Sequence, residues 1–208
     1  MITAEELQKK LAPVTIGSNT CNFSLEKCQE LTPKINQINK LKKEKNAIIL
    51  AHSYVSPEII TGVADFVGDS FDLSKKAATA DCEMIIFAAV KFMAETAKIL
   101  SPNKRVFIPS AVNGCSLADS ITADEVIALK KQYPDYAFIC YINTSADVKA
   151  LCDACVTSSN VNKIVTDYPN DKIFFLPDKL MGMNIQNYLT EHNINKTLKY
   201  SDGKCYVH

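Results

Sequence analysis

Two cysteines lie in matching sequence contexts, 90 residues apart. Cys115 and Cys205 each follow a short apolar or β-prone run and a turn that contains glycine. The strand-like runs Ala47–Ala51 and Ala137–Tyr141 are separated by the same 90 residues. A repeated α/β unit that ends each copy on a cysteine predicts a metal site shared between the copies, because thiolates are strong metal ligands.

A second group of reactive side chains follows predicted strands. His52 and Tyr54 come directly after the first strand, and an imidazole beside a phenol can bind a carboxylate or transfer protons. Tyr141 ends a later strand, and Asn143 follows it with hydroxyl residues that can hold a substrate carboxylate without a charge. The alternative interpretations are a structural histidine and ordinary capping of the next helix.

Two predicted helix starts carry hydroxyl residues. Gly68–Ser70 and Thr157–Ser159 each precede a predicted helix, whose N-terminal N–H groups and dipole favour an anion. A plain N-cap is the alternative at each place. The pair Cys152 and Cys155 forms a CxxC in a predicted helix interior without a second pair, so we interpret both as packing residues.

Strands and helices alternate along most of the chain, which predicts an α/β fold of repeated small three-layer domains with short parallel sheets. Ligands of such sheets bind at the carboxyl ends of the strands. We expect an N-terminal extension with weak pattern, a first α/β domain and a second α/β domain. Their residues are 1–32, 33–118 and 119–208, and the predicted helices include 33–45, 56–66, 69–80 and 145–154.

Composition narrows the classes of function. Lys plus Arg and Asp plus Glu are both 23, and this balance argues against binding to nucleic acid or an anionic membrane. No apolar run reaches the roughly 20 residues of a membrane span, and the acidic N-terminus lacks the features of a signal peptide. We therefore expect a cytoplasmic protein whose 8 cysteines are buried thiols, ligands or nucleophiles rather than disulfides.

Eight motifs occur in an order that closely resembles the quinolinate synthase family. The resemblance runs from about residue 33 to the last residue. The motifs are Ala51–Tyr54 (AHSY), Ala64–Ser70 (ADFVGDS), Val90–Leu100 (VKFMAETAKIL), Gly114–Asp119 (GCSLAD), Tyr141–Ala146 (YINTSA), Val156–Asn160 (VTSSN), Phe175–Asp178 (FLPD) and Gly203–His208 (GKCYVH).

The resemblance implies three related α/β domains around a cleft, each giving one cysteine to a [4Fe–4S] cluster. Cys115 and Cys205 match the first two ligands, and the iron without a protein ligand would act as a Lewis acid. The family condenses iminoaspartate (iminosuccinate) with dihydroxyacetone phosphate to quinolinate on the de novo route to NAD. L-aspartate oxidase or aspartate dehydrogenase would supply the imine.

The resemblance also implies roles for individual residues. His52, Ser70, Tyr141, Asn143 and Ser158 would bind the iminosuccinate. Catalytic roles fall to Tyr54, near the open iron, and to His208.

The sequence ends just after the second ligand, and the family's third domain is absent from it. We expect a fragment, a truncated reading frame or one half of a split enzyme. Two other hypotheses remain open: a non-catalytic module that binds dicarboxylates, and a zinc site made by Cys115, Cys205 and His208.

Overall fold

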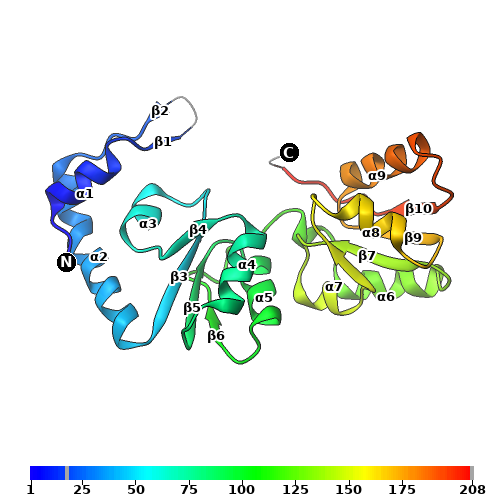
Figure 1. Ribbon diagram of the computed structural model, residues 1–208, viewed down its shortest axis with the longest axis horizontal. Helices are drawn as coiled ribbons and strands as arrows, with labels where there is room; N and C mark the ends of the chain where they lie inside the picture. Colours follow the sequence, from blue (N-terminus) through cyan, green and yellow to red (C-terminus); the bar gives the residue numbers. More distant parts are fainter. Residues whose placement is uncertain (17–18, 207–208) are drawn as a thin grey trace. The chain divides into compact units, whose positions relative to one another are not determined.

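The computed structural model describes residues 1–16 and 19–206, which fold into two compact units. The first comprises Met1–Ala89 and Thr96–Ala111, and the second comprises Val90–Glu95 and Val112–His208. Each contains a four-stranded parallel sheet with helices on its faces (Figure 1). The predicted α/β class with short parallel sheets is confirmed. No helix in the described residues is both long and apolar enough to cross a membrane.

The sheet of the first unit has the strand order β4-β3-β5-β6. Its central strand β3 carries buried apolar side chains on both faces, as expected for a parallel strand covered by helices. The strands are β3 (Ala47–His52), β4 (Phe66–Gly68), β5 (Met84–Ala88) and β6 (Arg105–Phe107), and the connecting helices are α3 (Pro57–Gly62), α4 (Ser70–Thr79) and α5 (Lys91–Leu100).

The second unit repeats this topology with the strand order β8-β7-β9-β10. A short 3-10 turn, η1 (Ala118–Ser120), precedes it and follows Cys115. The strands are β7 (Ala137–Tyr141), β8 (Ala154–Val156), β9 (Lys172–Leu176) and β10 (Thr197–Tyr200), and the helices are α6 (Ala123–Gln132), α7 (Ala146–Ala150), α8 (Val161–Asp167) and α9 (Lys179–Glu191). The sequence spacing therefore reflects a repeat of strand order as well as of motifs.

The first 32 residues contain more structure than their weak pattern indicated. Helix α1 (Ala4–Leu11) begins with a capping box between Thr3 and Glu6, and a short hairpin of β1 (Thr15–Ile16) and β2 (Asn19–Thr20) follows. Leu7 and Leu11 are fully buried in one core with residues of β3. This segment therefore contributes to the core of the first unit.

Helix α2 (Leu25–Glu44) begins eight residues before the predicted start. The predicted helix over residues 33–45 began at Pro33, but this proline lies inside the helix, and Ser24 is the N-cap. Thr32 Oγ1 donates to the carbonyl of Cys28 at 2.7 Å, next to the place where the proline lacks an N–H. The predicted helix is therefore confirmed in type, and its start was wrong.

The two edge strands β4 and β8 were not predicted, and the predicted helices before them ended at their first residues, Phe66 and Ala154. Each has only three residues, which is too short to display a period of two. The prediction that Cys152 and Cys155 lie inside one helix is therefore wrong: Cys152 follows the end of α7, and Cys155 lies in β8.

Candidate functional site

In the first unit, His52 lies at the carboxyl end of β3 beside the start of α4. It is the register partner of Gly68 at the end of β4. The rings of His52 and Tyr54 have centroids 4.0 Å apart, and the Tyr54 N–H donates to His52 Nδ1 at 3.3 Å. Since Nδ1 accepts, the neutral imidazole carries its proton on Nε2, where it can donate to a ligand oxygen.

Burial lowers the pKa of His52 below 6.5, and the nearby carboxylate of Asp69 opposes that shift. The imidazole is therefore neutral at pH 7. Asp69 is also the N-cap of α4, because its Oδ1 accepts the N–H groups of Phe71 and Asp72, both at 2.9 Å. Ser70 is the first residue of α4 and half-buried, so its hydroxyl is not required for the cap.

In the second unit, Tyr141 lies at the end of β7 within electrostatic reach of both predicted cysteine ligands. Burial raises the pKa of its phenol, and Asp178, Cys115 and Cys205 raise it further. A hydrogen bond with Ser158 has the opposite, smaller effect on this pKa. Tyr141 is therefore a neutral donor at pH 7. Three predicted site residues, Cys115, Cys205 and Ser158, therefore lie near this phenol.

The segment before Cys205 extends the sheet and contacts the turn after Cys115. Gly203 accepts the Lys179 N–H and donates its own N–H to the Pro177 carbonyl, both at 3.0 Å. A Cβ on Gly203 would lie 2.3 Å from that carbonyl oxygen and 2.5 Å from Ser120 Oγ. The position therefore requires glycine because a backbone atom fills the space of a side chain.

A pocket of about 340 Å³ adjoins Cys205 within this unit. Asp178 lines this pocket and is 8% exposed, although the sequence pattern did not indicate it as a site residue. Its Oδ1 accepts the Met181 N–H at 3.0 Å and so caps α9. An aspartate before a helix is an ordinary capping signal, and its proximity to Tyr141 becomes evident only in three dimensions.

The remaining predicted residues have different surroundings. Asn143 is half-buried two residues beyond β7, and Ser145 caps α7 through the Val148 N–H at 3.3 Å. The helix expected after residues 157–159 is present, but Asn160 occupies its N-cap position, and Asn160 Oδ1 accepts the Thr157 N–H at 2.8 Å in the turn before it. Helix α8 then begins at Val161. His208 lies outside the described residues.

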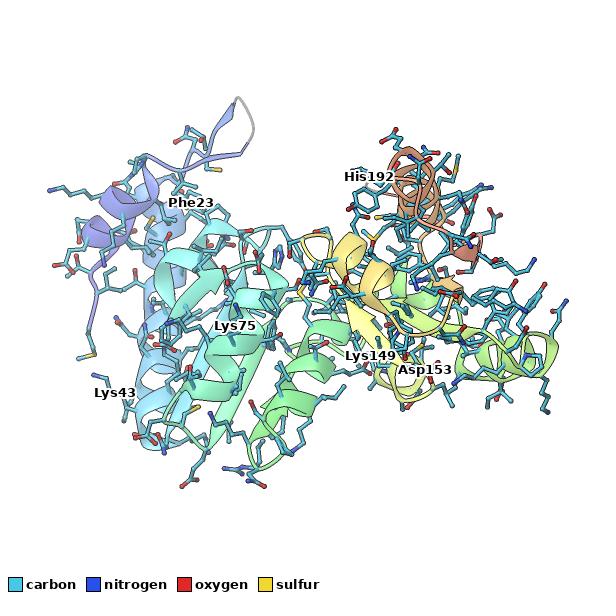
Figure 2. The ribbon with its side chains drawn as sticks, turned by 45° about the vertical axis from the view of Figure 1, so that its right-hand side comes forward. Phe23, Lys43, Lys75, Lys149, Asp153 and His192 are labelled. Atoms are coloured by element: carbon cyan, nitrogen blue, oxygen red, sulfur yellow. The ribbon has the colours of Figure 1, made fainter. Side chains whose placement is uncertain are left out.

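Three other cysteines form a separate cluster with Lys149 of α7, labelled in Figure 2. Cys140 is fully buried in β7, and its Cα register partner in β8 is Cys155. Hydrogen bonding with Cys152 raises the pKa of Cys140 to about 12, and hydrogen bonding with Cys140 raises the pKa of Cys155. The raised pKa values keep the thiols of Cys140 and Cys155 protonated at pH 7, and protonated thiols are poor nucleophiles.

The described residues contain no cluster of three or more His, Cys, Asp or Glu side chains arranged to hold a metal ion. Cys115 and Cys205 are free, half-buried thiols in one unit. They fit two positions of a sulfur-ligated site, and a third protein thiolate would have to come from outside these residues.

Comparisons with known proteins agree with the motif pattern. Residues 36–208 match the family model described as quinolinate synthetase A protein. The quinolinate synthase of Caldicellulosiruptor bescii is 51% identical over 173 residues, which are 83% of this chain and 55% of that protein. That of Sinorhizobium medicae is 47% identical over 176 residues, which are 85% of this chain and 48% of that protein.

The chain spans about half the length of these curated relatives. Among solved structures, ornithine transcarbamoylase from Giardia lamblia covers 84% of this chain and 65% of its own, with 13% identity and a TM-score of 0.23, a likeness that carries no argument. The match over residues 36–208, together with these identities, shows that the chain belongs to the quinolinate synthetase A family.

Proposed function

We propose that this chain forms part of a quinolinate synthase, which condenses iminoaspartate with dihydroxyacetone phosphate and releases quinolinate, phosphate and water. The family match over residues 36–208 carries the proposal. The environment of Tyr141 supports it, because a neutral phenol with Cys115 and Cys205 within electrostatic reach combines a substrate-binding group with two metal ligands.

A [4Fe–4S] cluster is the proposed cofactor. Cys115 and Cys205 would supply two thiolates, and the part of the relatives that this chain does not cover would supply the third. The bound cluster would provide a Lewis acid through the iron that lacks a protein ligand. Free thiols and an iron–sulfur cofactor both suit a reducing compartment, so we propose a cytoplasmic location.

The chain's own residues would bind and orient the iminosuccinate. Tyr141, Asn143 and Ser158 offer neutral donors to a carboxylate at the end of β7 and β8. His52 would donate from Nε2, and Ser70 would add an N–H or hydroxyl from the first turn of α4. Neutral donors bind a carboxylate without depending on a titrating group near pH 7.

Two further residues have proposed catalytic roles. Tyr54 contacts the His52 ring and would transfer a proton, and His208 would assist at the other end of the chain. Because imines hydrolyse in water, an enzyme that forms iminoaspartate in situ, such as L-aspartate oxidase or aspartate dehydrogenase, is the proposed upstream source.

Turnover tests this proposal directly. The chain is combined anaerobically with the third α/β domain of a relative, reconstituted with iron and sulfide, and supplied with iminoaspartate and dihydroxyacetone phosphate. We expect quinolinate from the combination and none from the Cys115→Ala variant. Binding of a dicarboxylate without quinolinate formation in the completed protein would favour a binding module instead.

A further inference from the structure

Asp119 forms hydrogen bonds with both the N–H and the carbonyl group of Cys115. Its Oδ2 accepts the Cys115 N–H at 3.0 Å, and its own N–H donates to the Cys115 carbonyl at 2.8 Å. These two bonds close a tight turn around the cysteine and restrict its φ and ψ. Since the accessible rotamers of a side chain depend on φ and ψ, the bonds also restrict the direction of the thiol.

Gly114 makes this approach of the carboxylate possible. A Cβ on Gly114 would lie 2.7 Å from Asp119 Oδ2, closer than real Cβ contacts. Any side chain at this position would therefore push the carboxylate away from the Cys115 N–H. The glycine before the cysteine and the aspartate after it are parts of one arrangement.

The same turn contacts the segment that carries Cys205. The Tyr206 N–H donates to Ser116 Oγ at 3.3 Å, and Ser120 Oγ lies where a side chain of Gly203 would be. A change in the turn at residues 115–120 would therefore alter the backbone near both Cys115 and Cys205.

We propose that Asp119 is a positioning residue that fixes the backbone of Cys115 and thereby aims its thiol. The inference rests on the proposed function in one respect, namely that Cys115 is a metal ligand. The hydrogen bonds themselves are independent of that role, so the positioning can be measured in metal-free protein.

Three variants separate geometry from charge. Asp119→Ala removes both the acceptor and the charge, whereas Asp119→Asn keeps an oxygen that can accept the Cys115 N–H. Asp124→Ala is the matched control, because Asp124 is an exposed aspartate in the first turn of α6. Iodoacetamide labels the metal-free chain, and mass spectrometry of peptides gives the rate at each cysteine.

In Asp119→Ala we expect labelling of Cys115 to accelerate by about threefold or more, because thiol reactivity follows exposure and local environment. Asp119→Asn and Asp124→Ala should stay within about twofold of the unchanged chain, which the same dependence on environment predicts. The buried thiol of Cys140 reports unfolding of this unit and should keep its slow rate.

Equal acceleration in Asp119→Ala and Asp119→Asn would overturn the positioning role in favour of a charge effect, and no acceleration in Asp119→Ala would overturn it outright. If Asp119→Ala also exposes Cys140, the labelling rate of Cys115 is measured in Gly114→Ala instead, because this variant displaces the carboxylate of Asp119 without removing it. Accelerated labelling of Cys115 alone supports the proposal, and an unchanged rate contradicts it.

A second readout uses the completed, iron- and sulfide-loaded protein. Asp119→Ala should shift the electron paramagnetic resonance signal of the reduced cluster, and Asp119→Asn should restore it. If the unchanged protein assembles no cluster, the proposed function is wrong. The labelling rates in metal-free protein still test the positioning role of Asp119.

Discussion

The Ser158 hydroxyl interacts with the Tyr141 phenol near the carboxyl ends of the neighbouring parallel strands β7 and β8. This interaction lowers the pKa of the phenol, so it favours the phenolate, but burial and the nearby carboxylate of Asp178 raise the pKa by more. This balance keeps Tyr141 protonated and available as a donor.

Ser158→Ala should raise the pKa of Tyr141 further, because the substitution removes an interaction that stabilises the phenolate. An alkaline titration followed by NMR of ¹³Cζ-labelled tyrosine measures the change. Ser159→Ala is the control, since Ser159 Oγ pairs with Thr157 Oγ1 at 2.9 Å instead. A Tyr141 pKa that is lower or unchanged in Ser158→Ala would contradict the assigned bond.

Asp69→Asn should lower the pKa of His52 further, because the negative charge that favours the imidazolium is lost. Asparagine caps a helix as well as aspartate does, so α4 should remain intact. Proton NMR of the imidazole during titration measures the shift, and Asp72→Asn serves as the control. If Asp69→Asn raised this pKa, the electrostatic assignment would be wrong.

The lowered pKa of His52 also predicts how the free energy of unfolding depends on pH. Its pKa is lowered from 6.5 in the folded state, so the unfolded chain binds this proton more readily. The contribution of neutral His52 to the free energy of unfolding is present above pH 6.5 and is lost as the pH falls through the folded pKa. Urea unfolding at several pH values should show a shallower loss in His52→Gln, and an identical slope would refute the effect.

Gly203→Ala should destabilise the second unit by about 1–3 kcal/mol, the usual cost of overpacking, since the new Cβ meets a backbone oxygen that cannot move freely. Thermal unfolding gives the difference. Gly68→Ala is the matched control, because a Cβ there lies 3.6 Å from its nearest neighbour. Equal stability of the two variants would show that the Gly203 contact is not restrictive.

Leu7→Ala should cost about 2–5 kcal/mol of unfolding free energy, as for other buried leucines. Leu7 is 0% exposed in the core of the first unit, whereas Leu100 is 49% exposed, and Leu100→Ala should have a small effect. Denaturant titration of both variants tests whether α1 belongs to the core. Equal, small effects would indicate that α1 contributes little to folding.

The sequence predicted the repeat and most elements because regular alternation of apolar strands and capped helices is a local property. Helix α6, for example, begins with a capping box of Thr122 and Glu125, which is a signal contained within four residues of sequence. The strands β4 and β8 were not predicted, because a strand of three residues is identified by its pairing with a neighbouring strand and has no clear sequence pattern of its own. Helix α1 was not predicted, because its two buried leucines pack against residues of α2 and β3 that are distant in sequence.

The candidate site was predictable in its residue types and only partly in its contacts. Cys115 and Tyr141 were identified from strand ends, and the structure places them within electrostatic reach of each other. The roles of Asp119 and Asp178 were not apparent, because an aspartate in a turn or at a helix start is common and its neighbours come from distant parts of the chain.

The most direct test of the central claim is the iron and acid-labile sulfide content after anaerobic reconstitution of the chain together with a third domain from a relative. We expect iron and sulfide in equal amounts, with the absorption of a [4Fe–4S] cluster, and loss of both in Cys115→Ala and in Cys205→Ala. Stoichiometric zinc without sulfide, or a cluster of unchanged occupancy in either variant, would contradict it.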